Sequence, residues 1–103
     1  MVVVSPRPQS TVAHTFTVSG KAPGGWFFEA VFPIQVRDEN NNVLAHAQAH
    51  ASGDWMTSNL VSFTSTVSIQ STYTGPATLI LLRDNPSGLP ENDDAQSVSI
   101  VIQ

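Results

Sequence analysis

The side chains best suited to acid–base or metal chemistry are three histidines, two of which lie close together in the chain. His46 and His50 share one face of an extended strand, but about 13 Å then separates them. One metal ion cannot bridge that gap, because each bond is about 2.0–2.1 Å long. A helix with the same spacing permits a shared metal, as in zinc-binding helices, but the glutamate of that motif is replaced by Ala47. We therefore expect solvent-facing strand histidines and no metal site.

Acidic and hydroxyl side chains are the other candidates for chemistry. The stretch 91–94 (Glu-Asn-Asp-Asp), with Asp84 nearby, offers carboxylates for calcium, but it lacks the spaced ligands of a calcium-binding loop. A solvated acidic loop is favoured over residues 84–94, and calcium binding there stays open. Serine and threonine are abundant, at 12 and 9 residues, yet no G-x-S-x-G elbow positions a nucleophile. With no cysteine either, we expect no catalytic residue and no cofactor.

The charge balance excludes nucleic-acid binding. The chain has a net charge of −4 and only four basic residues, which are scattered, whereas phosphate neutralisation needs a basic patch. No apolar run approaches the roughly 18 residues of a membrane span, so we expect no direct membrane insertion.

The elements that must position these residues are short strands, because apolar and polar residues alternate along nearly every segment. Strands are predicted at residues 2–4, 11–19, 26–37, 43–51, 60–70, 77–83 and 97–102. Gly, Pro and Asn clusters mark the turns between them, including a loop over 20–25. About seven short strands without a βαβ unit predict an antiparallel β-sandwich, a single all-β domain over 1–103. Pro33 lies inside the third strand and predicts an edge position or a bulge.

The aromatic residues are the most informative candidates for binding. Phe28 belongs to the core-facing set of its strand, which places Phe27 on the opposite face. Trp26 enters that strand from a glycine loop, and Trp55 stands at another loop exit. We expect both tryptophans to seal the ends of the sandwich. The alternative is a partly exposed patch that binds a partner or, together with Tyr73, stacks on sugar rings.

Short motifs along the whole chain resemble the Gmad2 family, the immunoglobulin-like domain of bacterial spore germination, sporulation and other secreted proteins. They are Val4-Ser5-Pro6, Val18-Ser19-Gly20-Lys21-Ala22, Phe28-Glu29-Ala30, Gly53-Asp54-Trp55 and Asp84-Asn85-Pro86-Ser87-Gly88. Members usually carry glycine after the Phe-Glu pair, where this chain has Ala30. The resemblance implies an immunoglobulin-like antiparallel β-sandwich that acts as a non-catalytic module. It brings no catalytic residues and does not settle the ligand.

Three functions from different classes follow. The leading hypothesis is an adhesion or assembly module that binds a protein or cell-envelope component through loops or an edge strand. The second is a carbohydrate-binding module that uses Trp26, Trp55 or Tyr73. The third is a protease inhibitor, because the loops containing Asn85 and Ser87 and residues 23–26 resemble those of chagasin-like inhibitors. We also expect a domain excised from a larger exported protein, placed outside the cytoplasm or at the cell surface by a signal beyond this sequence.

Overall fold

The computed structural model describes residues 1–84 and 94–103, which form an all-β domain, as predicted. Within these ranges no helix is long and apolar enough to cross a membrane. The elements are β1 (Val2–Ser5), β2 (Ser10–Val12), β3 (Thr15–Pro23), the short 3-10 helix η1 (Gly24–Trp26), β4 (Val31–Asp38), β5 (Val43–Ala51), β6 (Leu60–Ser68), β7 (Gly75–Leu82) and β8 (Ala95–Ile102).

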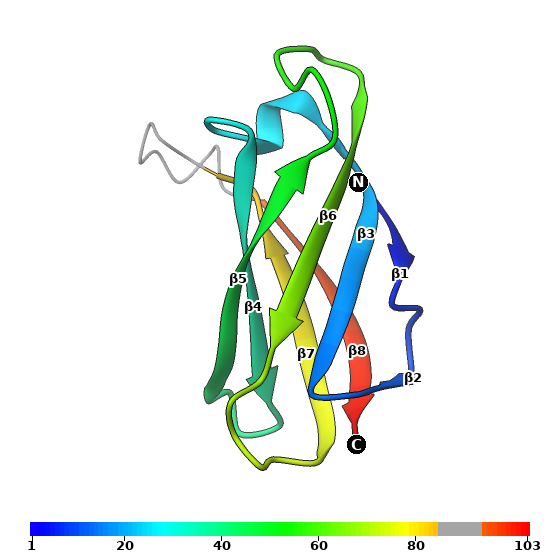
Figure 1. The fold of residues 1–103 in the computed structure, drawn as a ribbon, viewed down its shortest axis with the longest axis vertical. Coiled ribbons are helices and arrows are strands. Elements are labelled where there is room, and N and C mark those ends of the chain that lie inside the picture. The colour runs from blue at the N-terminus through cyan, green and yellow to red at the C-terminus, as the bar shows by residue number, and fades with distance from the viewer. Residues whose placement is uncertain (85–93) are drawn as a thin grey trace.

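The strands form one curled sheet in the order β1-β3-β6-β5-β4-β7-β8-β2. Figure 1 shows β3 and β6 crossing in front of β7 and β8, so the curled sheet has two facing layers. Neighbouring strands are antiparallel except β2 and β8, which are parallel. The two N-terminal strands lie at opposite ends of the order because Pro6 and Pro8 interrupt the segment between them. The two facing layers of this mostly antiparallel sheet agree with the predicted sandwich.

Two predictions for residues 11–25, a strand over 11–19 and a loop over 20–25, were wrong. The expected strand over 11–19 is divided, since residues 10–12 pair with β8 while β3 pairs with β1 and β6. The expected loop over 20–25 continues β3 as far as Pro23. Gly20 belongs to the strand because β1 approaches it closely: a β carbon there would lie 2.2 Å from the Val2 carbonyl oxygen. The glycine therefore permits strand pairing rather than ending it.

The core centres on Phe32, whose ring has no exposed surface. Trp26, Phe27 and Phe63 each place a ring in edge contact with it, at centroid distances of 5.6, 5.1 and 5.0 Å. These separations and the steep angles between the rings are the favoured geometry of aromatic pairs. The aromatic cluster thus joins η1, β4 and β6 across the interior.

The faces predicted for Phe27 and Phe28 were reversed. Phe27 is buried and Phe28 is exposed, because no continuous strand runs from 26 to 37. η1 occupies residues 24–26, and a tight turn at Glu29 and Ala30 precedes β4. The turn changes which residues point inward, so the inward and outward positions of β4 do not predict the direction of the Phe28 side chain.

Pro33 lies in β4, which is paired on both sides and has its register shift at Val36 and Arg37, so the predicted edge position or bulge at Pro33 was wrong. Opposite β5 it faces Gln48, but the pairing with β7 begins only at Ile34. The missing amide hydrogen of proline therefore falls at a position where one side of the strand is locally unpaired, as the physics of proline requires.

Candidate functional site

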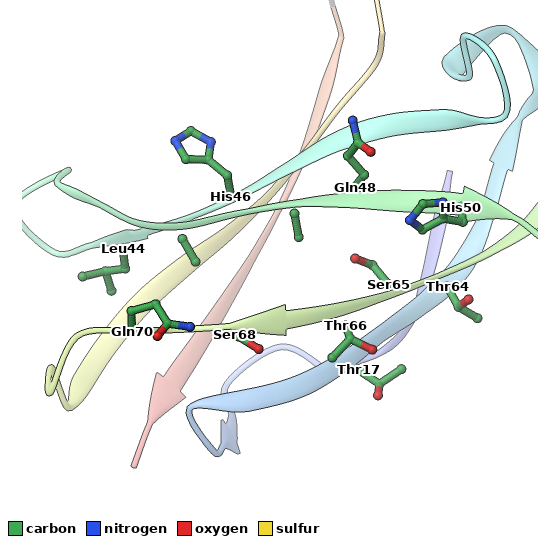
Figure 2. A pocket seen from close by; sticks show the side chains of 12 residues that line it. Thr17, Leu44, His46, Gln48, His50, Thr64, Ser65, Thr66, Ser68 and Gln70 are labelled. Atoms are coloured by element: carbon green, nitrogen blue, oxygen red, sulfur yellow. The ribbon is translucent and has the colours of Figure 1, made fainter.

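A groove of about 850 Å³ lies between β5 and β6. We call it the β5–β6 groove; it is lined by Thr17, Leu44, Ala45, His46, Ala47, Gln48, His50, Thr64, Ser65, Thr66, Ser68 and Gln70. It exists because the two strands pair only at one end, where His50 lies opposite Thr64 and Ala51 opposite Phe63. Beyond this point the strands diverge, as Figure 2 shows. Its volume is that of a typical ligand pocket, roughly 300–1,000 Å³.

The walls of the β5–β6 groove are polar and contain no Lys, Arg, Asp or Glu. Exposed side chains of β5 bring two imidazoles and an amide, and those of β6 bring hydroxyls. His46 and His50 are exposed strand residues, as predicted. Among the described residues no group of three or more His, Cys, Asp or Glu side chains is placed to hold a metal ion. The groove therefore offers hydrogen-bond donors and acceptors along both walls.

The interior side of the groove contains Ser65, the one buried polar residue in the described parts of the chain. It occupies the inward row of β6, between Phe63 and Val67. Its hydroxyl oxygen has no hydrogen-bond partner among the described residues, and Figure 2 shows it in the space between β5 and β6. Burying an unpaired hydroxyl costs about 1–3 kcal/mol. Ser65 is thus a functional candidate that the sequence analysis did not single out.

The predicted aromatic residues do not meet in one patch. Trp26 is only 6% exposed and packs against Phe32, so its ring faces the core. Trp55 is half-buried in the loop between β5 and β6 and packs against the core from there. Both rings pack against the core, which agrees with the expectation that the two tryptophans seal the sandwich. A role of Trp55 in ligand binding stays a prediction.

Tyr73 lies in the loop that joins β6 to β7, and its backbone and side chain are both engaged. Its hydroxyl donates to the Pro76 carbonyl, and its own carbonyl accepts a hydrogen bond from His14 Nε2 at 2.8 Å. The half-buried ring packs against the core. These contacts give Tyr73 a structural role at the corner, and a role in sugar stacking stays a prediction.

Asn85 and Ser87 lie outside the described residues, and so does most of the acidic loop over 84–94. At its start, the amide of Asp84 donates to the Trp26 carbonyl at 2.9 Å, and the Arg83 Nε donates to the Gly25 carbonyl at 3.3 Å. Arg83 and Asp84 therefore lie beside η1.

One sequence signal pointed to the β5–β6 groove. The inward row of β5 consists entirely of alanine, at 45, 47, 49 and 51, and the inward row of β6 contains a serine among large apolar residues. Small side chains on one strand opposite a hydroxyl on the other leave space in the interior. Recognising this space requires knowing that β5 faces β6, which the alternation of each strand alone does not give.

Comparison with known proteins gives one match. The model of the family described as Gmad2, immunoglobulin-like domain of bacterial spore germination, matches residues 1–88. A search of curated proteins found no match, and a search of solved structures found none.

Proposed function

Because this chain belongs to the Gmad2 family, the immunoglobulin-like domains of bacterial spore germination, we propose that it is a binding module of an exported bacterial protein. The module carries no chemistry of its own and holds a protein of the cell envelope or spore in an assembly. The observation that supports this proposal is the β5–β6 groove, where two strands diverge and leave their facing edges without a pairing strand among the described residues. A strand edge offers the backbone hydrogen bonds that another polypeptide can match.

The chemistry of the groove favours a polypeptide over the alternatives. Backbone edges select an extended chain, whereas a sugar site needs an exposed aromatic platform. Trp26 is buried, and Trp55 and Tyr73 lie in different loops. Protein binding is therefore the function that the geometry supports best.

The test is a set of parallel binding assays with the purified domain. The domain is immobilised, exposed to an envelope extract of the bacterium that encodes it, and any captured protein is purified and titrated by calorimetry. A glycan array and an inhibition assay with papain are run alongside. We expect saturable binding of a purified protein, no glycan signal and no inhibition. Glycan binding that a Trp55→Ala variant abolishes, without a protein partner, would overturn the proposal.

A further inference from the structure

The backbone of β6 points unpaired groups into the β5–β6 groove. In an antiparallel strand, successive residues direct their backbone N–H and C=O groups alternately to the two neighbours. The Ser52 amide of the β5 side donates to the Ser62 carbonyl, while the Ile69 amide donates to His14 on the β3 side. The even residues of β6 therefore face β5, and Thr66 and Ser68 face the groove. Neither pairs with β5 or with any other described strand on that side.

The backbone of β5 does the same from the opposite wall. The Ala51 amide donates to the Ala30 carbonyl on the β4 side, so odd residues of β5 face β4 and even residues face β6. The register with β4 is regular from Val31 to Val36, which extends this alternation back along β5. His46 and Gln48 thus direct their backbone groups into the groove, and within residues 1–84 and 94–103 no strand pairs with them there.

The floor between these edges can receive small side chains of an inserted strand. Ala47 is half-buried on the β5 side, and Ser65 is 5% exposed on the β6 side with an unpartnered hydroxyl. The hydroxyl can donate to a carbonyl or accept from an amide of a chain that lies between the walls. A buried polar atom without a partner needs an explanation in a native protein, and a bound peptide group supplies one.

The charge of the groove restricts the occupant. The chain has a net charge of −4, yet the lining contains no Lys, Arg, Asp or Glu. A charged side chain placed on the floor would lose its hydration without gaining an opposite charge. A segment that fits the groove is therefore uncharged over the residues that lie inside it. At alternate positions it has small apolar or hydroxyl side chains.

We propose that the β5–β6 groove binds an extended, uncharged segment of a partner protein, which adds as a strand to the open edges of β5 and β6. This proposal rests on the proposed function, because it names the part of the partner that the module holds. A segment of about five residues spans some 16 Å and covers the divergent part of both strands. Backbone hydrogen bonds supply the affinity. The limited space above Ala47 and Ser65 determines which side chains fit at alternate positions of the segment.

The first experiment uses synthetic peptides selected from a random eight-residue display library on the immobilised domain. Each amide of the selected peptide is then methylated in turn, which removes one backbone donor. Because the inserted strand pairs with β5 on one side and β6 on the other, its successive amides point alternately to the two walls. We therefore expect methylation of each amide inside the groove to weaken binding by about fivefold, the equivalent of one hydrogen bond, and methylation outside the groove to have little effect. We also expect slower amide exchange at Gln48 and Thr66 in the complex. Methylation without effect at any position, or an effect at alternate amides only, which would mean pairing with a single strand, would overturn the proposal. Protection confined to other strands would overturn it as well.

The second experiment changes the domain and keeps the same peptide. Gln48→Pro removes one groove-facing amide hydrogen while leaving the β4 pairing in place, and Ser65→Val removes the floor hydroxyl and fills its space. We expect each to weaken binding by about fivefold. The matched control is Ser62→Val, because Ser62 is exposed on the same strand but outside the groove. Equal affinities of Ser65→Val and Ser62→Val would contradict the proposal.

Two outcomes assign the groove differently. Self-association of the domain that Gln48→Pro abolishes would place a second copy in the groove and overturn the partner segment. A purified envelope protein that binds with unchanged affinity to Gln48→Pro and Ser65→Val would also overturn it, while the proposed function would stand. Absence of any protein partner would remove the proposed function as well.

Discussion

Phe28 and Val31 exchange both of their backbone hydrogen bonds, with N···O distances of 2.9 and 3.2 Å. Between them, Glu29 and Ala30 have φ angles of 51° and 70°. Positive φ at both central residues characterises the type I′ turn, where Asn-Gly is favoured. This chain places two residues with β carbons there, at a cost of about 1–2 kcal/mol for each left-handed residue. The turn that exposes Phe28 is therefore a strained one.

Ala30→Gly is expected to raise the free energy of unfolding by about 1 kcal/mol, because glycine adopts positive φ without a steric penalty. Urea unfolding followed by tryptophan fluorescence measures the change. The control is Ala51→Gly in the extended β5, which should lower stability by roughly 0.5–1 kcal/mol. Equal losses in the two variants would show that Ala30 is not strained.

Gly24→Ala is expected to lower the free energy of unfolding by about 1–3 kcal/mol through overpacking. A β carbon at Gly24 would lie 1.8 Å from the Thr57 carbonyl oxygen and 2.4 Å from that of Trp55. These are backbone atoms of the β5–β6 loop, so the loop must move. The neighbouring Gly25→Ala is the control, since the nearest atom to its β carbon is 3.8 Å away, on the Arg83 side chain. Thermal melts that show similar losses for both variants would contradict this role of Gly24.

Asp38 is expected to make stability depend on pH in the acid range. The hydrogen bond from the Asn42 amide, supported by the Asn42 side chain and the Asn40 amide, lowers the pKa of Asp38 below its usual 3.8. A lowered folded-state pKa stabilises the protein above the unfolded-state pKa, and this contribution disappears as the pH falls through the folded-state value. Wild type should therefore melt above Asp38→Asn at pH 7, and the gap should narrow below about pH 4. A pH-independent gap in melting temperature would rule out this linkage.

Ser65→Ala is expected to raise the free energy of unfolding by about 1 kcal/mol, because it removes a buried hydroxyl that has no hydrogen-bond partner in residues 1–84 and 94–103. Chemical unfolding of the isolated domain measures this directly. The exposed Ser62→Ala serves as the control and should change stability by less than about 0.5 kcal/mol. A clear loss of stability in Ser65→Ala would mean that the hydroxyl is satisfied in solution.

The comparison of prediction and structure is clearest at β5 and β6. Strict alternation predicted β5 with its observed ends, and it placed Val61, Phe63 and Val67 of β6 in the core, where they lie. Alternation failed at Phe28 because the turn at Glu29 and Ala30 shifts the phase of the chain. Turns that need positive φ are hard to recognise when glycine and asparagine are missing.

The sequence by itself determined the all-β class, most strands and the kind of surface, because the direction of a strand side chain is set locally by the period of two. It also determined the exclusions that follow from composition, such as the lack of a basic patch. Only the tertiary structure decided that Trp26 packs against Phe32 and that β5 pairs with β6 only at His50 and Ala51. Both depend on which strands pair and where pairing ends, which is settled by contacts between residues distant in the chain. The groove and the buried hydroxyl of Ser65 exist only because of that divergence.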